Sequence, residues 1–324
     1  MVRDRVRIVV VGAGDFGARH VATAAALEEI ELVGVADRDA ERAAAAVARY
    51  GGRPYADLAA ALAAERPDAV VIATPPSAHF ADLRRAVGQG IPVLVEKPVV
   101  STAAEVDLLQ ALSPEEKALV YPAHVSRFLP SFVELRAAMA DRRIRVIRAV
   151  RVVPAERVAL HGDVHPALAA MVHDLDLIRA LVAAPLEKIE SEQAWTDAAR
   201  PHPQSVVAHL RFSDGTIVSL DNTWTMPHSR QYIDARLEVH ADGLTGFLTL
   251  PAGGVLLSDA AGDHRPDVEL EAVAYGIPVG ALATQLRHFA ACAARRAVER
   301  AVSLDDALWS VRAALSIADQ HRRR

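Results

Sequence analysis

Two residues stand out by type and place as candidates for proton transfer, and the first is His173. It lies in an otherwise apolar stretch, LAAMVHDLDLI at residues 168–178, whose spacing predicts a helix. At helical spacing Ala169, His173 and Asp176 share one stripe, while the apolar residues form another. An imidazole with an unperturbed pKa of about 6.5 suits acid–base catalysis near neutral pH. A histidine on an apolar helix can equally be a packing residue, so the rest of the chain must separate these two interpretations.

The second residue is Lys97. Lys and Arg together number 36 in the chain, yet only Lys97, Lys117 and Lys188 are lysines. Where arginine is the habitual cation, a lysine marks a position that needs a compact ammonium able to give up its proton. Lys117 and Lys188 lie in charged segments typical of a solvated surface. Lys97 instead directly follows the apolar run IPVLVE, which makes it the candidate for catalysis.

The elements that would position Lys97 alternate in type along residues 1–121. Apolar runs predicted to be strands alternate with alanine-rich stretches predicted to be helices at 39–49, 56–64, 78–88 and 102–112. Thr102 and Glu105 have the spacing of a capping box at the start of the last helix. Strands that alternate with helices imply right-handed crossovers and a parallel, doubly wound sheet. Residues 1–121 are therefore predicted to form an α/β domain of the Rossmann type that binds a dinucleotide.

Glycines follow the first predicted strand. Residues 12–17, GAGDFG, fit the pattern G-x-G-x-x-G between a strand and a helix. The first glycine permits a tight turn, the second lets backbone approach a pyrophosphate, and the third lets the helix pack closely, while the helix N-terminus supplies amide donors to the anion. The predicted cofactor-binding residues of this loop are Gly12, Ala13, Gly14, Asp15, Phe16 and Gly17.

An acidic residue stands where this pattern requires one. Asp37 lies about 20 residues after Gly17 at the end of the second predicted strand, where a carboxylate accepts hydrogen bonds from the adenosine ribose. A carboxylate there repels the 2′-phosphate of NADP, so NAD is favoured. The adjacent Arg38 leaves NADP open, because an arginine can pair with that phosphate or simply stack on the adenine.

The second half of the chain differs in kind. The segments VIRAVRVVP, SVVAHLRF, GTIVSLDNTW and ARLEVHAD are rich in strand-forming residues, and Asp-Gly pairs at 214–215 and 242–243 predict tight turns. Residues 122–324 are predicted to form an α+β domain for substrate binding and oligomerisation, built on an open, mainly antiparallel sheet. Helices at 129–141, 165–184, 281–297 and 303–322 are expected to cover one face of that sheet. The exposed face predicts a homodimer or homotetramer.

Composition excludes several classes of protein. The chain has 324 residues, of which 52% are hydrophobic and 24% charged, as in a globular protein with two domains. Its net charge of −5 gives no general attraction to nucleic acid or to anionic membranes. No apolar run approaches the roughly 20 residues of a membrane span, and the N-terminus lacks the pattern of a signal peptide. A cytoplasmic protein is therefore expected.

No metal site is expected. The single cysteine, Cys292, cannot form an internal disulfide and has no zinc-type partner cysteine. His161 and His165 have a spacing compatible with metal binding on a helix. Gly162 and Pro166 disfavour a continuous helix through them.

Six motifs carry a resemblance to a known family. They occur in the order VVVGAGDFGARH, GVADRD, VIATPPSAHF, VEKP, AHVSRFLP and MVHDLDLIRAL. Together they resemble the glucose-fructose oxidoreductase and inositol dehydrogenase family, often written Gfo/Idh/MocA, over nearly the whole chain. The resemblance implies an NAD(P)-dependent oxidoreductase in which Lys97 lies beside the nicotinamide and hydrogen-bonds the reacting hydroxyl, while His173 transfers the proton. It further implies that the nicotinamide side of the cofactor is lined by Thr74, Pro75, Pro76, His79, Glu96 and Lys97.

The same resemblance adds candidates for substrate binding beside Lys97 and His173, namely His124, Arg127, Asp176 and Trp224. Asp176 either orients the imidazole or bonds a substrate hydroxyl, or else it is a buried structural acid. Arg127 either contacts the substrate or cofactor or pairs with a carboxylate. Trp224 either offers an apolar face to a sugar ring or packs in the core. Further polar residues near Trp224 that could contact a substrate are Asn222, His228 and Arg230.

The sequence departs from the family's pattern at Ala169. Many members have an aspartate there, one helical turn before the histidine. The missing carboxylate removes an acceptor for a substrate hydroxyl and one stabiliser of a charged Lys97 or His173. An altered substrate, a different proton relay and a loss of catalysis are therefore all open. His165, eight residues before His173 on the predicted helix, or Asp163 could supply a partial substitute.

These inferences favour one function over two alternatives. The favoured one is hydride transfer between nicotinamide and a hydroxyl or keto carbon of a sugar, cyclitol or nucleotide sugar. The first alternative is a glycosidase that retains its NAD and oxidises the sugar transiently so that an elimination cleaves the glycosidic bond. The second is a non-catalytic regulatory protein that keeps the NAD-binding fold, motivated by Ala169.

Overall fold

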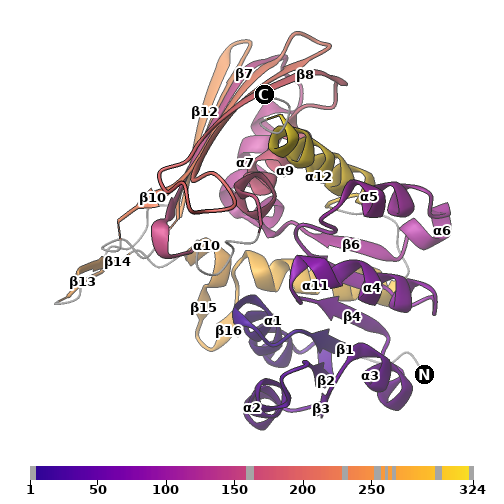
Figure 1. Cartoon of the computed structure of the whole chain (residues 1–324). Helices are drawn as coiled ribbons and strands as arrows, with labels where there is room; N and C mark the ends of the chain where they lie inside the picture. The colour runs from indigo at the N-terminus through magenta and orange to yellow at the C-terminus, as the bar shows by residue number, and fades with distance from the viewer. Residues whose placement is uncertain are drawn as a thin grey trace. The chain divides into compact units, whose positions relative to one another are not determined.

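The protein is described here by a computed structural model that covers residues 5–157, 164–227, 233–251, 257–259, 262–264, 268–295 and 301–320. The chain forms two compact units (Figure 1). The first unit comprises Met1–Phe128 with Glu271–Leu308, and the second unit comprises Leu129–Leu270 with Trp309–Arg324. The sequence placed a single boundary after residue 121. In the structure a late segment of the chain, 271–308, also belongs to the first unit.

The first unit is built on a parallel sheet of six strands in the order β3-β2-β1-β4-β5-β6. Each strand pairs in parallel with its neighbours. The strands are β1 (Val6–Val11), β2 (Ile30–Ala36), β3 (Arg53–Tyr55), β4 (Ala69–Ile72), β5 (Val93–Glu96) and β6 (Val120–Ala123). This strand order is that of a dinucleotide-binding sheet, and it reverses between β1 and β4. The predicted doubly wound α/β fold is confirmed.

Helices connect these strands close to where the sequence predicted them. They are α1 (Asp15–Ala26), α2 (Ala40–Tyr50), α3 (Leu58–Glu65), α4 (Pro76–Val87), α5 (Ala103–Gln110) and α6 (Pro114–Lys117). Thr102 and Glu105 form the predicted capping box at the start of α5. A 3₁₀ turn, η1 (Val125–Phe128), follows β6. The remaining short elements of residues 257–278 are β13 (Leu257–Asp259), β14 (Gly262–His264), α10 (Val268–Glu271), β15 (Val273–Ala274) and β16 (Ile277–Pro278).

One helix packs against a different sheet from the one expected. Helix α11 (Ala281–Arg295) was predicted to cover the antiparallel sheet, and this prediction is wrong. Its residues Leu286 and Phe289 belong to the same hydrophobic cluster as Ile8 of β1, and the ring of Phe289 meets Tyr121 of β6 edge to face at 5.1 Å. The apolar stripe of an amphipathic helix shows that the helix packs on a core. It does not show which core.

The second unit is built on a sheet in the order β12-β11-β7-β10-β9-β8. Its strands are β7 (Ile144–Pro154), β8 (Leu186–Ala194), β9 (Ser205–Phe212), β10 (Ile217–Met226), β11 (Asp234–Ala241) and β12 (Leu244–Leu250). The pair β7 and β10 is parallel and the other pairs are antiparallel, as predicted. Gly215 and Gly243 have φ of 87° and 76°, so both predicted Asp-Gly turns use the backbone freedom of glycine.

Helices cover one face of this second sheet (Figure 1). They are α7 (Pro130–Met139), the π-helical turn η3 (Ala167–Met171), α9 (Val172–Leu181) and the later part of α12 (Leu304–Asp319), with a 3₁₀ turn η2 (Ala155–Arg157) after β7. On α12, Trp309 stacks on Phe212 of β9, and the carbonyl of Ile317 accepts hydrogen bonds from Ser191 and Gln193 of β8. This contact fixes the later part of α12 on the sheet.

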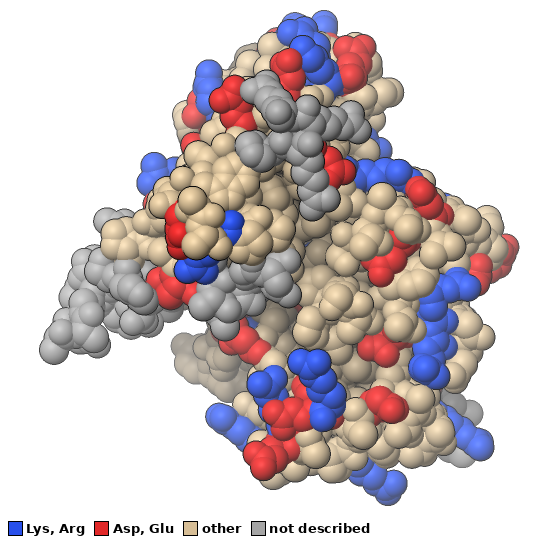
Figure 2. Space-filling model, viewed as in Figure 1, with Lys and Arg blue, Asp and Glu red and all other residues tan. Residues whose placement is uncertain are grey.

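Charged side chains lie on strands of the second sheet and over the protein surface. Exposed Arg145 and Arg148 of β7 pair with Asp242 and Glu238, and solvent screening makes such surface contacts weak. Figure 2 shows basic and acidic side chains interspersed over the visible face. None of the described helices is long and apolar enough to cross a membrane.

Candidate cofactor and catalytic site

The cofactor loop, residues 12–17, joins β1 to α1 and is packed closely at two of its glycines. Gly12 has φ +91°, and a Cβ there would lie 2.5 Å from the carbonyl oxygen of Ala73. A Cβ on Gly17 would lie 2.0 Å from the carbonyl oxygen of Gly12. At Gly14, the N-cap of α1, a Cβ would meet no atom within 4 Å. The loop therefore leaves open the space where the second glycine of this motif lets a pyrophosphate approach the helix N-terminus.

The carboxylate of Asp37 is held against this loop. Its Oδ2 accepts a hydrogen bond from the backbone N–H of Ala13 at 2.7 Å, and its Oδ1 accepts one from Asp39 at 2.9 Å. Arg38 is exposed. A carboxylate fixed at the end of β2 accepts hydrogen bonds from the ribose hydroxyls of NAD and repels the 2′-phosphate that NADP carries on the same ribose.

Neutralising Asp37 is expected to relax the preference for NAD. Two like unit charges about 4 Å apart repel each other by about 1 kcal/mol in bulk water and by about 4 kcal/mol near a protein surface. A difference of about 1.4 kcal/mol corresponds to a tenfold change in Kd. In Asp37→Asn the ratio of the Kd for NAD to the Kd for NADP should therefore rise at least about fivefold, as measured by calorimetric titration of both nucleotides. The control is Glu41→Gln, which removes an exposed charge from α2. An unchanged ratio in Asp37→Asn would show that Asp37 does not select the cofactor.

The turns after β4 and β5 are tied together by a buried histidine. The ring of His79 on α4 places Nε2 2.7 Å from the carbonyl oxygen of Thr74 and Nδ1 2.8 Å from that of Pro98. The buried hydroxyl oxygen of Thr74 has no hydrogen-bond partner among the described residues. Such a group is what a bound ribose or carboxamide would satisfy. Burial lowers the pKa of His79, while its two carbonyl neighbours act in the opposite direction.

This lowered pKa predicts a pH dependence of stability. Because the folded chain disfavours the proton on His79, the unfolded chain binds more protons below the ordinary pKa of about 6.5. The unfolding free energy should therefore fall as the pH drops below about 6.5, with a slope from this group of at most about 1.4 kcal/mol per pH unit. Denaturant unfolding between neutral and mildly acid pH should show a shallower slope for His79→Gln than for wild type. Equal slopes in His79→Gln and wild type would contradict the assignment.

Lys97 directly follows β5, at the edge of the parallel sheet where nucleotides bind. It is half-buried and precedes a cis peptide bond to Pro98. Buried Glu96 accepts a hydrogen bond from the Lys97 backbone N–H at Oε2, 3.2 Å away. Its Oε1 lies 2.8 Å from Nε2 of His20 on α1. No sequence motif assigned His20 a role, although His20 falls on the buried stripe of α1 with Gly17, Val21 and Ala24.

In the second unit, His173 lies near the start of α9. His173 and Ala169 are partly exposed, whereas Asp176 is fully buried. Asp176 follows His173 by three residues on the same helix and is the buried member of the predicted stripe. The π-helical turn η3 carries Ala169, and such turns are frequent at functional sites.

His165 lies just before η3 and not on the same helix as His173. Its Nδ1 accepts a hydrogen bond from the backbone N–H of Ala167 at 3.1 Å, and its Nε2 lies 3.3 Å from Oε1 of Gln193. The expectation that His165 lies on one helix with His173 is wrong, because the histidine ring bonds the first turn instead. His161, Asp163, His228 and Arg230 lie outside the described residues.

A buried ion pair fixes α9 beside His173. Arg151 of β7 donates through Nε and one terminal nitrogen to the two carboxylate oxygens of Asp174, each at 2.8 Å. Both side chains are buried. This paired geometry holds the helix at one register on the sheet.

Breaking this ion pair is expected to destabilise the protein strongly. Arg151→Met leaves the Asp174 carboxylate buried without its partner, which costs about 3–5 kcal/mol of unfolding free energy. The double variant Arg151→Met/Asp174→Leu removes both charges and should recover most of that loss. Chemical denaturation of the two variants and of wild type measures the difference. A single variant as stable as wild type would mean that the pair does not hold α9.

Trp224 and Asn222 belong to the packing behind this pair. The indole Nε1 of Trp224 donates to Oδ1 of Asn222 at 2.7 Å. Trp224 is buried in a cluster with Val153 and Ala170, against which Ala169 also packs. Ala169 is thus partly exposed, and its buried side packs against an apolar cluster that includes the indole ring of Trp224.

The remaining predicted residues lie around the end of β6. His124 is buried at the end of that strand. Arg127 is also buried, with a terminal nitrogen 3.9 Å from Oδ2 of Asp306. This arrangement is that of the carboxylate-paired arginine considered above. Among the described residues no group of three or more His, Cys, Asp or Glu side chains is placed to hold a metal ion.

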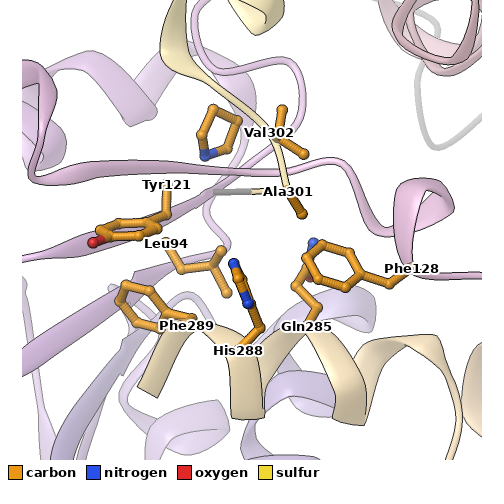
Figure 3. A pocket seen from close by; sticks show the side chains of 9 residues that line it. Leu94, Tyr121, Phe128, Gln285, His288, Phe289, Ala301 and Val302 are labelled. Atoms are coloured by element: carbon orange, nitrogen blue, oxygen red, sulfur yellow. The ribbon is translucent and has the colours of Figure 1, made fainter. Parts of the chain in front are cut away.

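A small pocket in the first unit contains none of the predicted site residues (Figure 3). Side chains of α11 project into it toward Leu94 and Tyr121 of the sheet. Neither amide atom of buried Gln285, which lines the pocket, has a hydrogen-bond partner among the described residues.

Comparison with protein families identifies both halves of the chain. The model of the GFO/IDH/MocA oxidoreductase family, with an NAD-binding Rossmann fold, matches residues 6–124. The model of the GFO/IDH/MocA C-terminal domain matches residues 159–245. The first matched range contains the parallel sheet with its cofactor loop, and the second contains a large part of the second unit.

Named relatives are similar at about one third identity. Inositol 2-dehydrogenase 1 of Saccharopolyspora erythraea is 33% identical over 268 residues, which cover 79% of this chain and 77% of the relative. UDP-N-acetylglucosamine 3-dehydrogenase of Acidithiobacillus ferrooxidans is 33% identical over 215 residues, which cover 66% of each chain. The latter match spans just under two thirds of that relative's length.

Solved structures share the fold along nearly the whole chain. GenD2 from gentamicin A biosynthesis, crystallised in complex with NAD, superposes with a TM-score of 0.84 at 23% identity and covers 99% of this chain and 96% of that chain. A myo-inositol dehydrogenase of Corynebacterium glutamicum superposes with a TM-score of 0.80 at 22% identity and covers 98% and 97%. With the open cofactor loop, the fixed Asp37 carboxylate and two family models in the predicted order, the chain belongs to the GFO/IDH/MocA oxidoreductase family and takes NAD as its cofactor.

Proposed function

We propose that this protein is an NAD-dependent dehydrogenase that transfers a hydride between the nicotinamide and a secondary hydroxyl or keto carbon of a sugar, cyclitol or nucleotide sugar. The observation that carries the proposal is the Glu96–Lys97–Pro98 segment at the end of β5. There a lysine in an arginine-rich chain is anchored at the edge of the sheet where the nucleotide binds. The names of the relatives, an inositol 2-dehydrogenase and a UDP-N-acetylglucosamine 3-dehydrogenase, support the substrate class.

The proposed chemistry divides between two side chains. NAD, when bound, supplies the hydride acceptor. Lys97 hydrogen-bonds the reacting hydroxyl and stabilises the negative charge that develops on its oxygen. His173 takes the proton during oxidation and returns it during reduction, a task suited to an imidazole near neutral pH. The buried pair Arg151–Asp174 keeps the helix that carries His173 in register.

Ala169 bears on which substrates are accepted. The side chain packs with Trp224, Val153 and Ala170, so no carboxylate is available there to accept a substrate hydroxyl. We infer that this part of the substrate presents an apolar group or a hydroxyl bonded elsewhere. When a substrate site lacks one hydrogen-bonding group, its selectivity among substrates depends on the polar groups that remain.

A substrate panel tests the proposal. Purified protein with NAD is mixed with cyclitols, free sugars and UDP-sugars, and the absorbance of the reduced nicotinamide is followed. Formation of NADH with at least one class is expected. Release of the chromophore from an aryl glycoside without net NADH would select a glycosidase instead, and bound NAD without reduction by any compound would favour a non-catalytic protein. The predicted homodimer or homotetramer is tested on the same sample by light scattering after size-exclusion chromatography.

A further inference from the structure

A buried histidine on the cofactor-loop helix contacts the residue that precedes Lys97. His20 of α1 has an exposed fraction of 0%, and its Nε2 lies 2.8 Å from Oε1 of Glu96. Glu96 itself is 7% exposed. Its second carboxylate oxygen accepts the backbone N–H of Lys97. One carboxylate thus joins a side chain of α1 to the backbone of the proposed catalytic lysine.

The chemistry of His20 and Glu96 determines which side chain donates the hydrogen bond between them. A carboxylate only accepts, so the imidazole donates from Nε2–H to Glu96. His20 Nδ1 has no hydrogen-bond partner among the described residues, so the contact of this ring with a polar side chain is the one that Nε2 makes with Glu96. A buried carboxylate that lost this donor would move to find another or draw in water. Because Glu96 also holds the Lys97 amide, such a movement would shift the backbone of Lys97.

The position of His20 is itself fixed by the cofactor loop. His20 lies one turn after Gly17, whose close approach to Gly12 sets the start of α1. The ring of Phe16 meets the His20 ring edge to face at 5.6 Å. The helix that receives the pyrophosphate and the strand end that carries Lys97 are therefore connected through one imidazole.

We propose that His20 is a positioning residue that sets the place of Lys97 by holding Glu96. On the other side of Lys97, the carbonyl oxygen of Pro98 lies 2.8 Å from Nδ1 of His79, a contact independent of His20. Loss of His20 therefore releases one of two anchors and displaces Lys97 without detaching the segment. The expected effect of His20 on turnover rests on the role of Lys97 in the proposed function. The expected displacement of Lys97 does not depend on that role.

The scarcity of lysines gives a direct probe. Only Lys97, Lys117 and Lys188 carry ε-amines, so reductive methylation with isotope-labelled formaldehyde gives three lysine signals in an NMR spectrum, apart from that of the N-terminal amine. Lys117→Arg and Lys188→Arg assign them. In His20→Leu the Lys97 signal is expected to move and to titrate at a different pH, while the Lys117 and Lys188 signals stay in place.

Two further variants separate positioning from general loosening. His20→Gln keeps an N–H that can reach Glu96 and should restore the wild-type Lys97 signal. Val21→Ala removes buried volume from the same helix without touching Glu96 and should leave the signal unchanged. His20→Asn, whose shorter side chain stays polar but cannot reach Glu96, should behave like His20→Leu and serves if the latter does not fold.

The Lys97 signals of these variants test the proposed role of His20 without a known substrate. An unmoved Lys97 signal in both His20→Leu and His20→Asn would overturn it, and so would an equal movement in Val21→Ala. With a substrate in hand, His20→Leu should lower kcat and leave the Kd for NAD unchanged. If a Lys97 variant kept full activity, the proposed function would fail while the NMR result on His20 stood.

Discussion

Lys97→Met is expected to lower kcat by about 10²–10⁴-fold, the range for removing a proton-transfer group or an oxyanion donor. The Kd for NAD should stay close to that of wild type, because the cofactor loop and Asp37 hold the pyrophosphate and the adenosine ribose. Methionine keeps the length of the side chain and its contacts with apolar neighbours but carries no charge and no proton. Steady-state kinetics with the best substrate of the panel, together with calorimetric titration of NAD, measure both quantities.

Two control variants sharpen this result. Lys117→Met removes a lysine that pairs with Asp305 near the surface and should leave kcat unchanged. Lys97→Arg keeps the positive charge but brings a planar guanidinium that does not release its proton at neutral pH, so it should remain severely impaired. Full activity of Lys97→Met would remove Lys97 from the mechanism.

Gly14→Ala is expected to weaken NAD binding by at least about tenfold, or about 1.4 kcal/mol, without loss of stability. The added Cβ meets no atom within 4 Å in the protein, and the backbone of Gly14 at φ −70° and ψ −166° is one that alanine adopts. The methyl group would instead occupy the space through which the pyrophosphate approaches the backbone. Its unfolding free energy without cofactor should stay within about 0.5 kcal/mol of wild type.

Gly17→Ala is the matched comparison in the same loop. There the Cβ would lie 2.0 Å from a backbone oxygen, so the loop or α1 must move. A loss of at least about 1–3 kcal/mol of unfolding free energy is expected before any cofactor is added. Denaturant titrations with and without NAD distinguish the two variants. Tight NAD binding by Gly14→Ala would place the pyrophosphate elsewhere.

Much of the fold could be predicted because its signals are local. Apolar runs separated by alanine-rich helices determine the parallel sheet, and the Asp-Gly turns at 214–215 and 242–243 determine two hairpins of the second sheet. The packing of α11 could not be predicted, since its apolar stripe fits either sheet. The π-helical turn at Ala167–Met171 was also missed, because the spacing of apolar residues does not distinguish it from an α-helix over so few residues.

The site was predictable in its parts and not in its contacts. The glycines, Asp37 and Lys97 stand out by residue type and place, and the NAD cofactor predicted from them is confirmed by the family model. The roles of Lys97 and His173 stay predictions. The contact of His20 with Glu96 joins residues 76 positions apart, and no local pattern encodes a contact of that range. A polar residue on the buried stripe of α1 was the only available sign of it.

Ala169 shows where sequence and structure complement each other. The sequence identifies a missing carboxylate, and the structure places apolar neighbours around the position. Among the three consequences considered, this contact with an apolar cluster favours an altered substrate.

Transfer of deuterium tests the central claim most directly. The protein is incubated with NAD and with a cyclitol or UDP-sugar that carries deuterium on every ring carbon, and the recovered nicotinamide is analysed by mass spectrometry. Hydride transfer predicts deuterated NADH from wild type and at least about 10²-fold less over the same time from Lys97→Met. Consumption of the labelled compound with recovery of unlabelled nucleotide would contradict direct transfer from a carbon of the substrate to NAD.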